Sequence, residues 1–283
     1  MKVFGDELVK NSEITVNKNA FLRRMVLYER NTKLLITDTH NSYLHLFDLD
    51  GHLLMSILIK SIPSCICVHI SNKNEIFIGD INKEKIFVYK SNFIDHRLFI
   101  KDILPEYIQI DNEFDSTRLY VSECKDKLSV WKINDGKKIG SIKIKSPWTI
   151  NFSEHNIYVS SPAFKNKNPD SKIDPIKLKD SCIYEINKDK LEIKRRIIGD
   201  WCSPFLLNIE SNSNIILLAF TFNEINGTLS EMRYFLIIDK NGHIIKKIEL
   251  PYSQNMCDSI LFRKKLFICN NENTSNKLRL YEL

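Results

Sequence analysis

The chain has 283 residues, 43% of them hydrophobic, and a net charge of +6 from 41 basic and 35 acidic side chains. This hydrophobic share supports a large core, and eight glycines with eight prolines are too few for a collagen-like or disordered chain. No continuous run of about 18 apolar residues is present, so we expect no membrane partner. The mild positive charge is compatible with an acidic partner or a phosphate backbone, and equally with an ordinary solvated surface.

The seven cysteines bear on the redox state of the protein. They are odd in number, include no C-x-x-C pair and form no cluster with histidines at zinc-site spacing: Cys65, Cys67, Cys124, Cys182, Cys202, Cys257 and Cys269. We therefore expect seven free thiols, no metal and no cofactor. The stretch Met1–Val16 lacks the apolar core of a signal peptide, so the sequence indicates a cytoplasmic protein.

Three successive segments in the first half of the chain repeat one plan. Each reads as a strand, a polar turn, a second strand, a second turn and a third strand: Leu34–Ile57, Glu75–Ile100 and Arg118–Ile142. Three later segments are more divergent copies: Asn156–Phe164 with Ser181–Ile197, Asn214–Phe222 with Arg233–Leu250, and Lys265–Leu283. A Lys-rich insertion divides the fourth unit, and the sixth stops one strand short. A nearly continuous apolar run precedes each unit, starting at Met25 in the first, and predicts one further buried strand.

The spacing of these units predicts the fold class. The end of the second strand recurs after 42, 42, 53, 54 and 43 residues, at Phe47, Tyr89, Trp131, Tyr184, Ile238 and Tyr281. A period near 42 residues with four short strands per unit predicts an all-β, six-bladed β-propeller. Phe4–Val9 resembles the strand that the last unit lacks, so we expect the N-terminal strand to close the ring. The prediction is one domain, 1–283, with blades near 17–58, 59–100, 101–142, 143–198, 199–250 and 251–283 plus 1–16.

The first unit resembles the NHL repeat. The matching residues are Ile36, Thr37, Asp38, Asn41, Leu46, Phe47, Asp48, Asp50 and Gly51, with Tyr43 where the repeat usually has Arg. The run before the second unit is also similar, with Cys65 where the family usually has Gly. The family includes protein-binding and RNA-binding domains of tripartite-motif proteins, so the resemblance implies a scaffold without assigning one activity.

Catalytic motifs are missing from the sequence. The histidines take different positions within their units, except that His52 and His243 both follow an Asp-Gly or Asn-Gly turn, so we expect structural or exposed roles for them and no metal site. Asp38 and Asp80 recur at one position, which is typical of a carboxylate that stabilises a turn. No G-x-S-x-G, H-E-x-x-H or Walker loop occurs, so we expect no catalytic residue and no enzyme.

The candidate binding residues lie where each unit's first strand begins. We expect these connecting loops to lie beside the central channel on one face, and they carry Arg23, Arg24, Lys60, Lys143, Lys145, Trp148, Trp201, Phe205 and Tyr252. Cations interleaved with aromatics suit an aromatic-anchored peptide or the bases and phosphates of single-stranded RNA. The structural alternative is that Trp148 and Trp201, each near a proline, pack between blades. The lysines of the 165–179 insertion are interrupted by acidic residues, which favours a solvated loop.

Three functions follow, in order of preference. The first is a monomeric, non-catalytic scaffold that binds a protein or peptide through this face. The second is single-stranded RNA binding by the same basic and aromatic residues. The third is an enzyme of the propeller lyase or lactonase kind.

Overall fold

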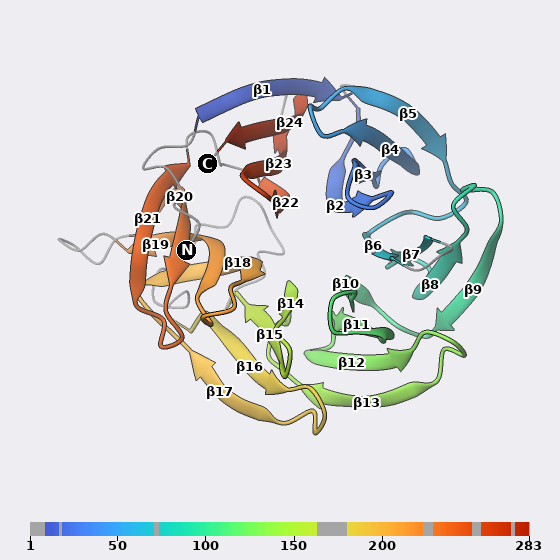
Figure 1. Ribbon diagram of the computed structural model, residues 1–283. Coiled ribbons are helices and arrows are strands. Elements are labelled where there is room, and N and C mark those ends of the chain that lie inside the picture. The colour runs from blue at the N-terminus through green and yellow to red at the C-terminus, as the bar shows by residue number, and fades with distance from the viewer. Residues whose placement is uncertain are drawn as a thin grey trace. The chain divides into compact units, whose positions relative to one another are not determined.

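The computed structural model describes residues 9–16, 19–70, 74–162, 180–222, 229–250, 256–272 and 275–282. Every regular element within these ranges is a β-strand, and the strands form six four-stranded antiparallel sheets (Figure 1). The all-β prediction is therefore confirmed. Among the residues that the structure places, no helix is long and apolar enough to span a membrane.

The first three sheets each follow chain order, from a first strand to a last strand. The first contains β2 (Leu22–Tyr28), β3 (Lys33–Asp38), β4 (Tyr43–Asp48) and β5 (Leu53–Leu58). The second contains β6 (Cys65–His69), β7 (Glu75–Asp80), β8 (Lys85–Tyr89) and β9 (His96–Lys101). The third contains β10 (Pro105–Asp111), β11 (Asp115–Glu123), β12 (Lys127–Lys132) and β13 (Lys138–Lys143).

The remaining sheets repeat this plan, with one exception at the end. The fourth contains β14 (Ile150–Phe152), β15 (Asn156–Ser161), β16 (Cys182–Asn187) and β17 (Ile193–Ile197). The fifth contains β18 (Trp201–Ile209), β19 (Ile215–Phe222), β20 (Leu229–Ile238) and β21 (Ile244–Leu250). The sixth contains β22 (Met256–Phe262), β23 (Lys265–Glu272), β24 (Ser275–Glu282) and, as its last strand, β1 (Val9–Val16).

The N-terminal strand completes the sixth sheet, as predicted. β1 pairs antiparallel with β24, with Val9 opposite Glu282 and Val16 opposite Asn276 (Figure 1). The paired strand lies within residues 1–16, which the sequence analysis assigned to the sixth blade. The paired residues start at Val9, and residues 4–8 lie outside the described part of the chain.

The strands belong to two compact units. Unit 1 comprises Met1–Val121, Trp131–Lys137 and Asn255–Leu283, and therefore holds the sheets of β2–β5, β6–β9 and β22–β24 with β1. Unit 2 comprises Ser122–Val130 and Lys138–Gln254, and holds the sheets of β14–β17 and β18–β21. The single domain and its blade boundaries stay predictions.

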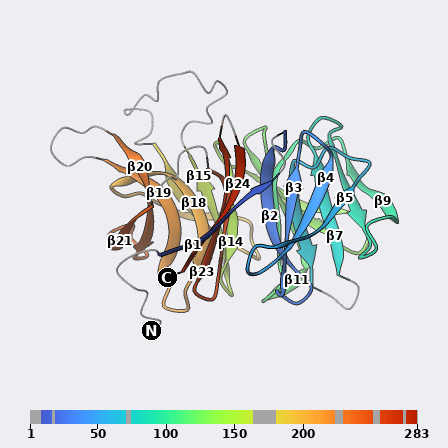
Figure 2. The ribbon, with the colours of Figure 1, turned by 90° about the horizontal axis from the view of Figure 1, so that it is seen from above.

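Burial follows the position of a strand within its sheet. In the first sheet, whose strands lie side by side in Figure 2, β3 and β4 are buried on both faces whereas β5 is almost wholly exposed. The core of unit 1 lies between sheets: Phe47 of β4 packs against Phe267 of β23 and Leu280 of β24. In unit 2, Trp201, Leu217 and Leu236 belong to a comparable cluster. This sandwiching explains why the middle strands are continuous apolar runs.

Two hairpin turns, at Gly51 and Gly242, share one geometry. Both glycines have positive φ, 94° and 98°, which only glycine adopts without strain. In each turn one carboxylate oxygen accepts the backbone N–H groups two and four residues later, and the other contacts the histidine ring. The pairs are Asp48 with His52 (2.8 Å) and Asp239 with His243 (3.0 Å). These two histidines are therefore turn partners.

Candidate binding site on the first strands of unit 1

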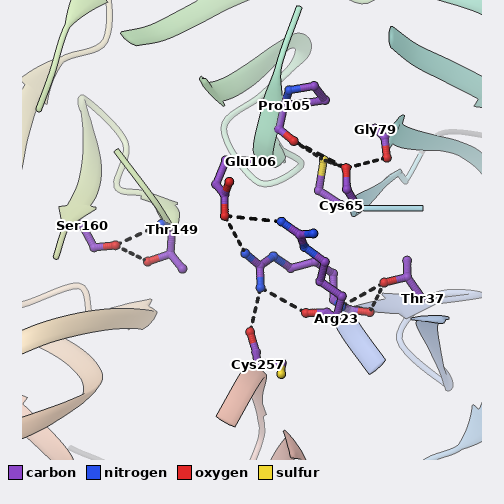
Figure 3. A network of polar contacts seen from close by, with 11 residues as sticks. Arg23, Thr37, Cys65, Gly79, Pro105, Glu106, Thr149, Ser160 and Cys257 are labelled. Atoms are coloured by element: carbon purple, nitrogen blue, oxygen red, sulfur yellow. Dashed lines mark hydrogen bonds and ion pairs between the residues drawn. The ribbon is translucent and has the colours of Figure 1, made fainter. Parts of the chain in front are cut away.

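Arg24 is the centre of a buried charge cluster in unit 1. It lies in β2 and is only 4% exposed. Its Nη1 donates to the main-chain oxygen of Cys257 (2.7 Å) in β22 and to that of Arg23 (3.0 Å) (Figure 3). Its Nη2 lies 3.8 Å from Glu106 Oε1, and its guanidinium stands over the Tyr107 ring, 5.5 Å from the centroid. One side chain thus connects the first strands of three sheets.

Asp258 is the buried carboxylate of this cluster. It is 1% exposed, and its Oδ2 accepts the backbone N–H of Met25. Within the described residues its Oδ1 has no hydrogen-bond partner. Burial disfavours the charged form and raises the pKa of Asp258 to about 7, against the opposing effect of Arg24. Asp258 therefore titrates near neutral pH, whereas Asp258 and Glu106 overcome the effect of burial on Arg24 and raise its pKa.

Arg23 is the solvent-facing member of the cluster. Its Nη2 lies 3.6 Å from the same Glu106 Oε1 that faces Arg24, and 24% of its side chain is exposed (Figure 3). Among the described residues, Glu106 is its ion-pair partner. Two guanidiniums thus face the one carboxylate of Glu106, and the other carboxylate of the cluster, Asp258, has its pKa raised to about 7 by burial. The cluster consequently keeps an excess of positive charge beside Arg23.

Hydrogen bonds to the backbone fix the register of β2 and hence both arginines. Thr37 Oγ1 of β3 accepts the backbone N–H of Arg24 at 2.9 Å. The Asn271 amide of β23 donates to the main-chain oxygen of Leu22 (2.8 Å) and accepts its N–H (3.1 Å). Beside the cluster, Cys65 fills the space next to Gly79, where an added Cβ would lie 2.3 Å from the Cys65 sulfur (Figure 3). The cysteine side chain at position 65 therefore requires glycine at position 79.

Three of the predicted binding residues are buried, which corrects the sequence interpretation. Arg24, Trp201 (1% exposed) and Phe205 (0%) belong to strands rather than to exposed loops. β2 begins at Leu22, ahead of the apolar run that starts at Met25, and β18 begins at Trp201. Arg24 can lie in a buried strand because it has carboxylate neighbours, and Trp201 because its indole donates to Gly242 O at 3.1 Å. Trp201 therefore packs in the core of unit 2, as the structural alternative held.

The other predicted residues differ in their surroundings. Lys60, Lys143 and Lys145 are exposed, with Lys145 lying 3.8 Å from Asp180. Trp148 is half-buried and packs edge-on against Phe205, with ring centroids 5.3 Å apart. Tyr252 and the lysines of the 165–179 insertion lie outside the described residues.

Sequence reasoning missed Glu106, Tyr107 and Asp258. All three occur near the start of a first strand, as Arg24 does. A charged residue within an otherwise apolar buried strand needs a partner of opposite charge. The repeated occurrence of charged residues near the start of a first strand was therefore the signal in the sequence for a buried charge cluster. Pairing Arg24 with residues far along the chain required the structure.

A second polar chain crosses β3, β4 and β5. Asp38 accepts the backbone N–H groups of Phe21 (2.9 Å) and Asn41 (3.3 Å), and its Oδ2 lies 3.5 Å from His45 Nε2. The other nitrogen of this ring, Nδ1, lies 2.9 Å from Ser56 Oγ. Hydrogen bonds from His45, Asn41 and Phe21 overcome the effect of burial and lower the pKa of Asp38 to about 2. Asp80 likewise accepts the N–H groups of Ile62 and Lys83, so both predicted turn carboxylates are confirmed.

Among the residues that the structure describes, the cysteines form no disulfide and the side chains that could bind a metal are not clustered. All seven cysteines are free thiols, as predicted, and five are buried. Burial raises the pKa of Cys65 and of Cys202 to about 12. Within the ranges that the structure places, no three His, Cys, Asp or Glu side chains are grouped to hold a metal ion.

Comparison with known proteins supplies the architecture. No family model and no curated protein sequence matches the chain. Hydrazine synthase of Kuenenia stuttgartiensis is similar in structure, with a TM-score of 0.65 and 12% identity over 90% of this chain and 75% of that one. Virginiamycin B lyase from Staphylococcus aureus has a TM-score of 0.63 and 11% identity over 98% of this chain and 100% of that one. The fold is a six-bladed β-propeller. Both names are those of enzymes, but at this identity the likeness to this propeller concerns the fold alone.

Proposed function

We propose that this propeller is a non-catalytic scaffold that binds an acidic segment of a partner protein at Arg23. The observation that carries the proposal is that Arg23 and Arg24 share the single carboxylate of Glu106 while Arg23 stays partly exposed. A guanidinium offers five donors in a planar fork that matches a carboxylate, and a separation of 3.6 Å from Glu106 leaves that fork available. An incoming Asp or Glu side chain would neutralise the excess positive charge.

Burial of the aromatic residues favours a protein partner over RNA. Single-stranded RNA binding relies on exposed rings on which bases stack, each stack being worth about 1–3 kcal/mol. Trp201 and Phe205 are buried, and the exposed part of Trp148 is limited by its packing on Phe205. A guanidinium can bind a carboxylate without an exposed aromatic ring nearby.

The family and the compartment are further parts of the proposal. We propose an NHL-type propeller, which the residues matched around Asp38 support because this carboxylate and Asp80 hold equivalent turns. Seven free thiols support a reducing, cytoplasmic compartment.

The test is a titration with defined probes. Wild-type protein is titrated with a fluorescein-labelled peptide of alternating Glu and Gly, with its Lys–Gly counterpart and with oligouridine, at low and at high salt. We expect saturable binding of the acidic peptide only. Arg23→Gln should weaken it about tenfold or more, since hydrogen bonds to charged groups are worth about 1.5–3 kcal/mol.

A matched variant separates site binding from the overall charge of the protein. Lys101→Gln removes one positive charge from an exposed position of β9 and should leave the affinity unchanged. Equal weakening by both variants would reduce the proposal to non-specific electrostatics. Binding of oligouridine with the same dependence on Arg23 would favour RNA as the partner, and no binding of either probe at low salt would overturn the proposal.

A further inference from the structure

Three polar side chains lie in a row across the first sheet. Asp38 Oδ2 of β3 lies 3.5 Å from His45 Nε2 of β4, and His45 Nδ1 lies 2.9 Å from Ser56 Oγ of β5. The register of the sheet places His45 directly opposite Ser56, so the two paired strands hold these side chains together. A carboxylate, an imidazole and a hydroxyl in this order activate a serine as a nucleophile on several unrelated folds.

Asp38 fixes the tautomer of His45. Burial would raise the pKa of Asp38, but hydrogen bonds, first among them the one from His45, lower it to about 2. The group is therefore a carboxylate at neutral pH, and a carboxylate only accepts hydrogen bonds. The ring proton of His45 is consequently on Nε2, which faces Asp38, and Nδ1 is left as the acceptor for the Ser56 hydroxyl.

Ser56 is the solvent-exposed end of the row. Asp38 is 1% exposed and His45 5%, whereas Ser56 is exposed on β5, the last strand of its sheet (Figure 1). A reagent in solution can therefore reach this serine while the base behind it stays shielded from water.

The backbone N–H of Ser56 also points toward the open side of the sheet. Ile59 N donates to Ser42 O at 2.9 Å, three positions from the pair formed by Ser56 and His45. In an antiparallel pair, positions that bond to the neighbouring strand alternate with positions that point away from it. The Ser56 N–H therefore points away from β4, and the described sheet has no further strand on that side. There it can donate to the carbonyl oxygen of a group that Ser56 attacks, as a nucleophile's own N–H does in serine proteases.

The third unit of the chain contains a closely similar serine. The pattern S-I-x-I-K-S begins at Ser56 in the first unit and at Ser141 in the third. Ser141 is exposed on the last strand β13, as Ser56 is on β5. At the position of His45, counted back from the end of the second strand, the third unit has Ser129. The two serines therefore differ in the residue at the histidine position, and Ser141 is an internal control for Ser56.

We propose that Ser56 is a nucleophile that takes up an acyl group from an activated carboxylic ester, with His45 as general base and Asp38 as the residue that positions it. Ser56 Oγ attacks the carbonyl carbon of the ester, so that the Oγ–C bond forms and the bond from this carbon to the alcohol oxygen breaks. The hydroxyl proton passes to His45 Nδ1 and from there to the departing alcohol, so no further reactant is needed. The charge of Asp38 stabilises the intervening imidazolium. This modification of Ser56 is separate from peptide binding at Arg23 and does not depend on it.

The experiment treats the full chain with p-nitrophenyl acetate and follows the release of p-nitrophenolate, with mass spectrometry of the peptides that contain the two serines. We expect Ser56 to be acetylated about 100-fold or more faster than Ser141, because a general base contributes typically about 10²–10⁴-fold. Ser56→Ala should abolish this fast reaction. Ser141→Ala, the matched control, and Arg23→Gln should leave it unchanged. Equal rates of acetylation at Ser56 and Ser141 would overturn the proposal.

A second pair of variants leaves the buried residues of the row in place. The thiols introduced by Ser56→Cys and Ser141→Cys are alkylated with iodoacetamide at neutral pH, and the labelled peptides are compared. A histidine within hydrogen-bond distance favours the reactive thiolate, so the thiol at position 56 should react at least about tenfold faster. Equal rates, or a faster reaction at position 141, would contradict activation by His45.

The role of Asp38 is tested through the tautomer that it sets. Its Oδ1 accepts three backbone N–H groups, so in Asp38→Asn the amide nitrogen takes the place of Oδ2 and faces His45. The ring proton should then move to Nδ1, which the chemical shifts of the ring nitrogens report, and acetylation of Ser56 should slow to the rate of Ser141. A wild-type rate of acetylation in Asp38→Asn would overturn the proposal, because the base would then have no part in the reaction.

Discussion

Arg24 Nη1 donates a 2.7 Å hydrogen bond to the main-chain oxygen of Cys257, a residue that follows it by 233 positions in the chain. This bond joins the first strand of the first sheet to the first strand of the sixth. Asp258, next in the chain, accepts the backbone N–H of Met25, so β2 donates both of these bonds to β22. The pair therefore belongs to the architecture of unit 1, and the binding role that we propose rests on Arg23.

Replacement of Arg24 by alanine should destabilise the protein by about 3–5 kcal/mol, because the variant leaves buried Asp258 without its compensating charge. Lys101→Ala, at an exposed position of β9, is the control and should stay within about 0.5 kcal/mol, as for other surface positions. Urea unfolding of both variants measures the difference. Equal unfolding midpoints for Arg24→Ala and wild type would refute the structural role.

Asp258 should make the protein less stable as pH rises toward neutrality. Its pKa is about 7 in the folded protein and about 3.9 when unfolded. The stabilising contribution of the protonated form is therefore fully present below about pH 3.9 and is lost as pH rises through about 7. In Asp258→Asn the free energy of unfolding should lose this part of its pH dependence. Asp135→Asn is the control, at an exposed carboxylate whose pKa is lowered by Lys137. It should keep the wild-type dependence of the free energy of unfolding on pH between about 3.9 and 7. The same dependence in Asp258→Asn as in wild type would contradict the assignment.

Trp201→Ala should cost about 3–5 kcal/mol, the usual range for removing a buried tryptophan. It removes both the packing of the indole in unit 2 and its bond to Gly242 O. Trp148→Ala, at a half-buried position, should cost clearly less. Thermal unfolding compares the two, and the reverse order would mean that Trp148 is the core residue.

Deletion of residues 1–16 should lower the melting temperature of the whole protein. The deletion removes β1 and leaves one side of β24 without its partner strand. Calorimetry of the truncated and full-length proteins provides the test. Identical melting would show that β1 contributes nothing to the sixth sheet.

The repeat pattern was sufficient to predict the architecture. The recurrence of one position from Phe47 to Tyr281 counted the blades, and the missing last strand pointed to the N-terminus. The site was harder to predict, because an apolar pattern locates strands only where the buried face is apolar. Arg24 is buried through neighbours that are far away in the sequence, so β2 seemed to start at Met25.

The most direct test of the binding role is a charge-swap titration at Arg23. Wild-type protein should bind the alternating Glu–Gly peptide and not its Lys–Gly counterpart. Arg23→Glu should reverse this preference, binding the basic peptide at least about tenfold more tightly than the acidic one, and a cooperative melting transition checks that the variant is folded. An Arg23→Glu variant that retains wild-type affinity for the acidic peptide would contradict the account.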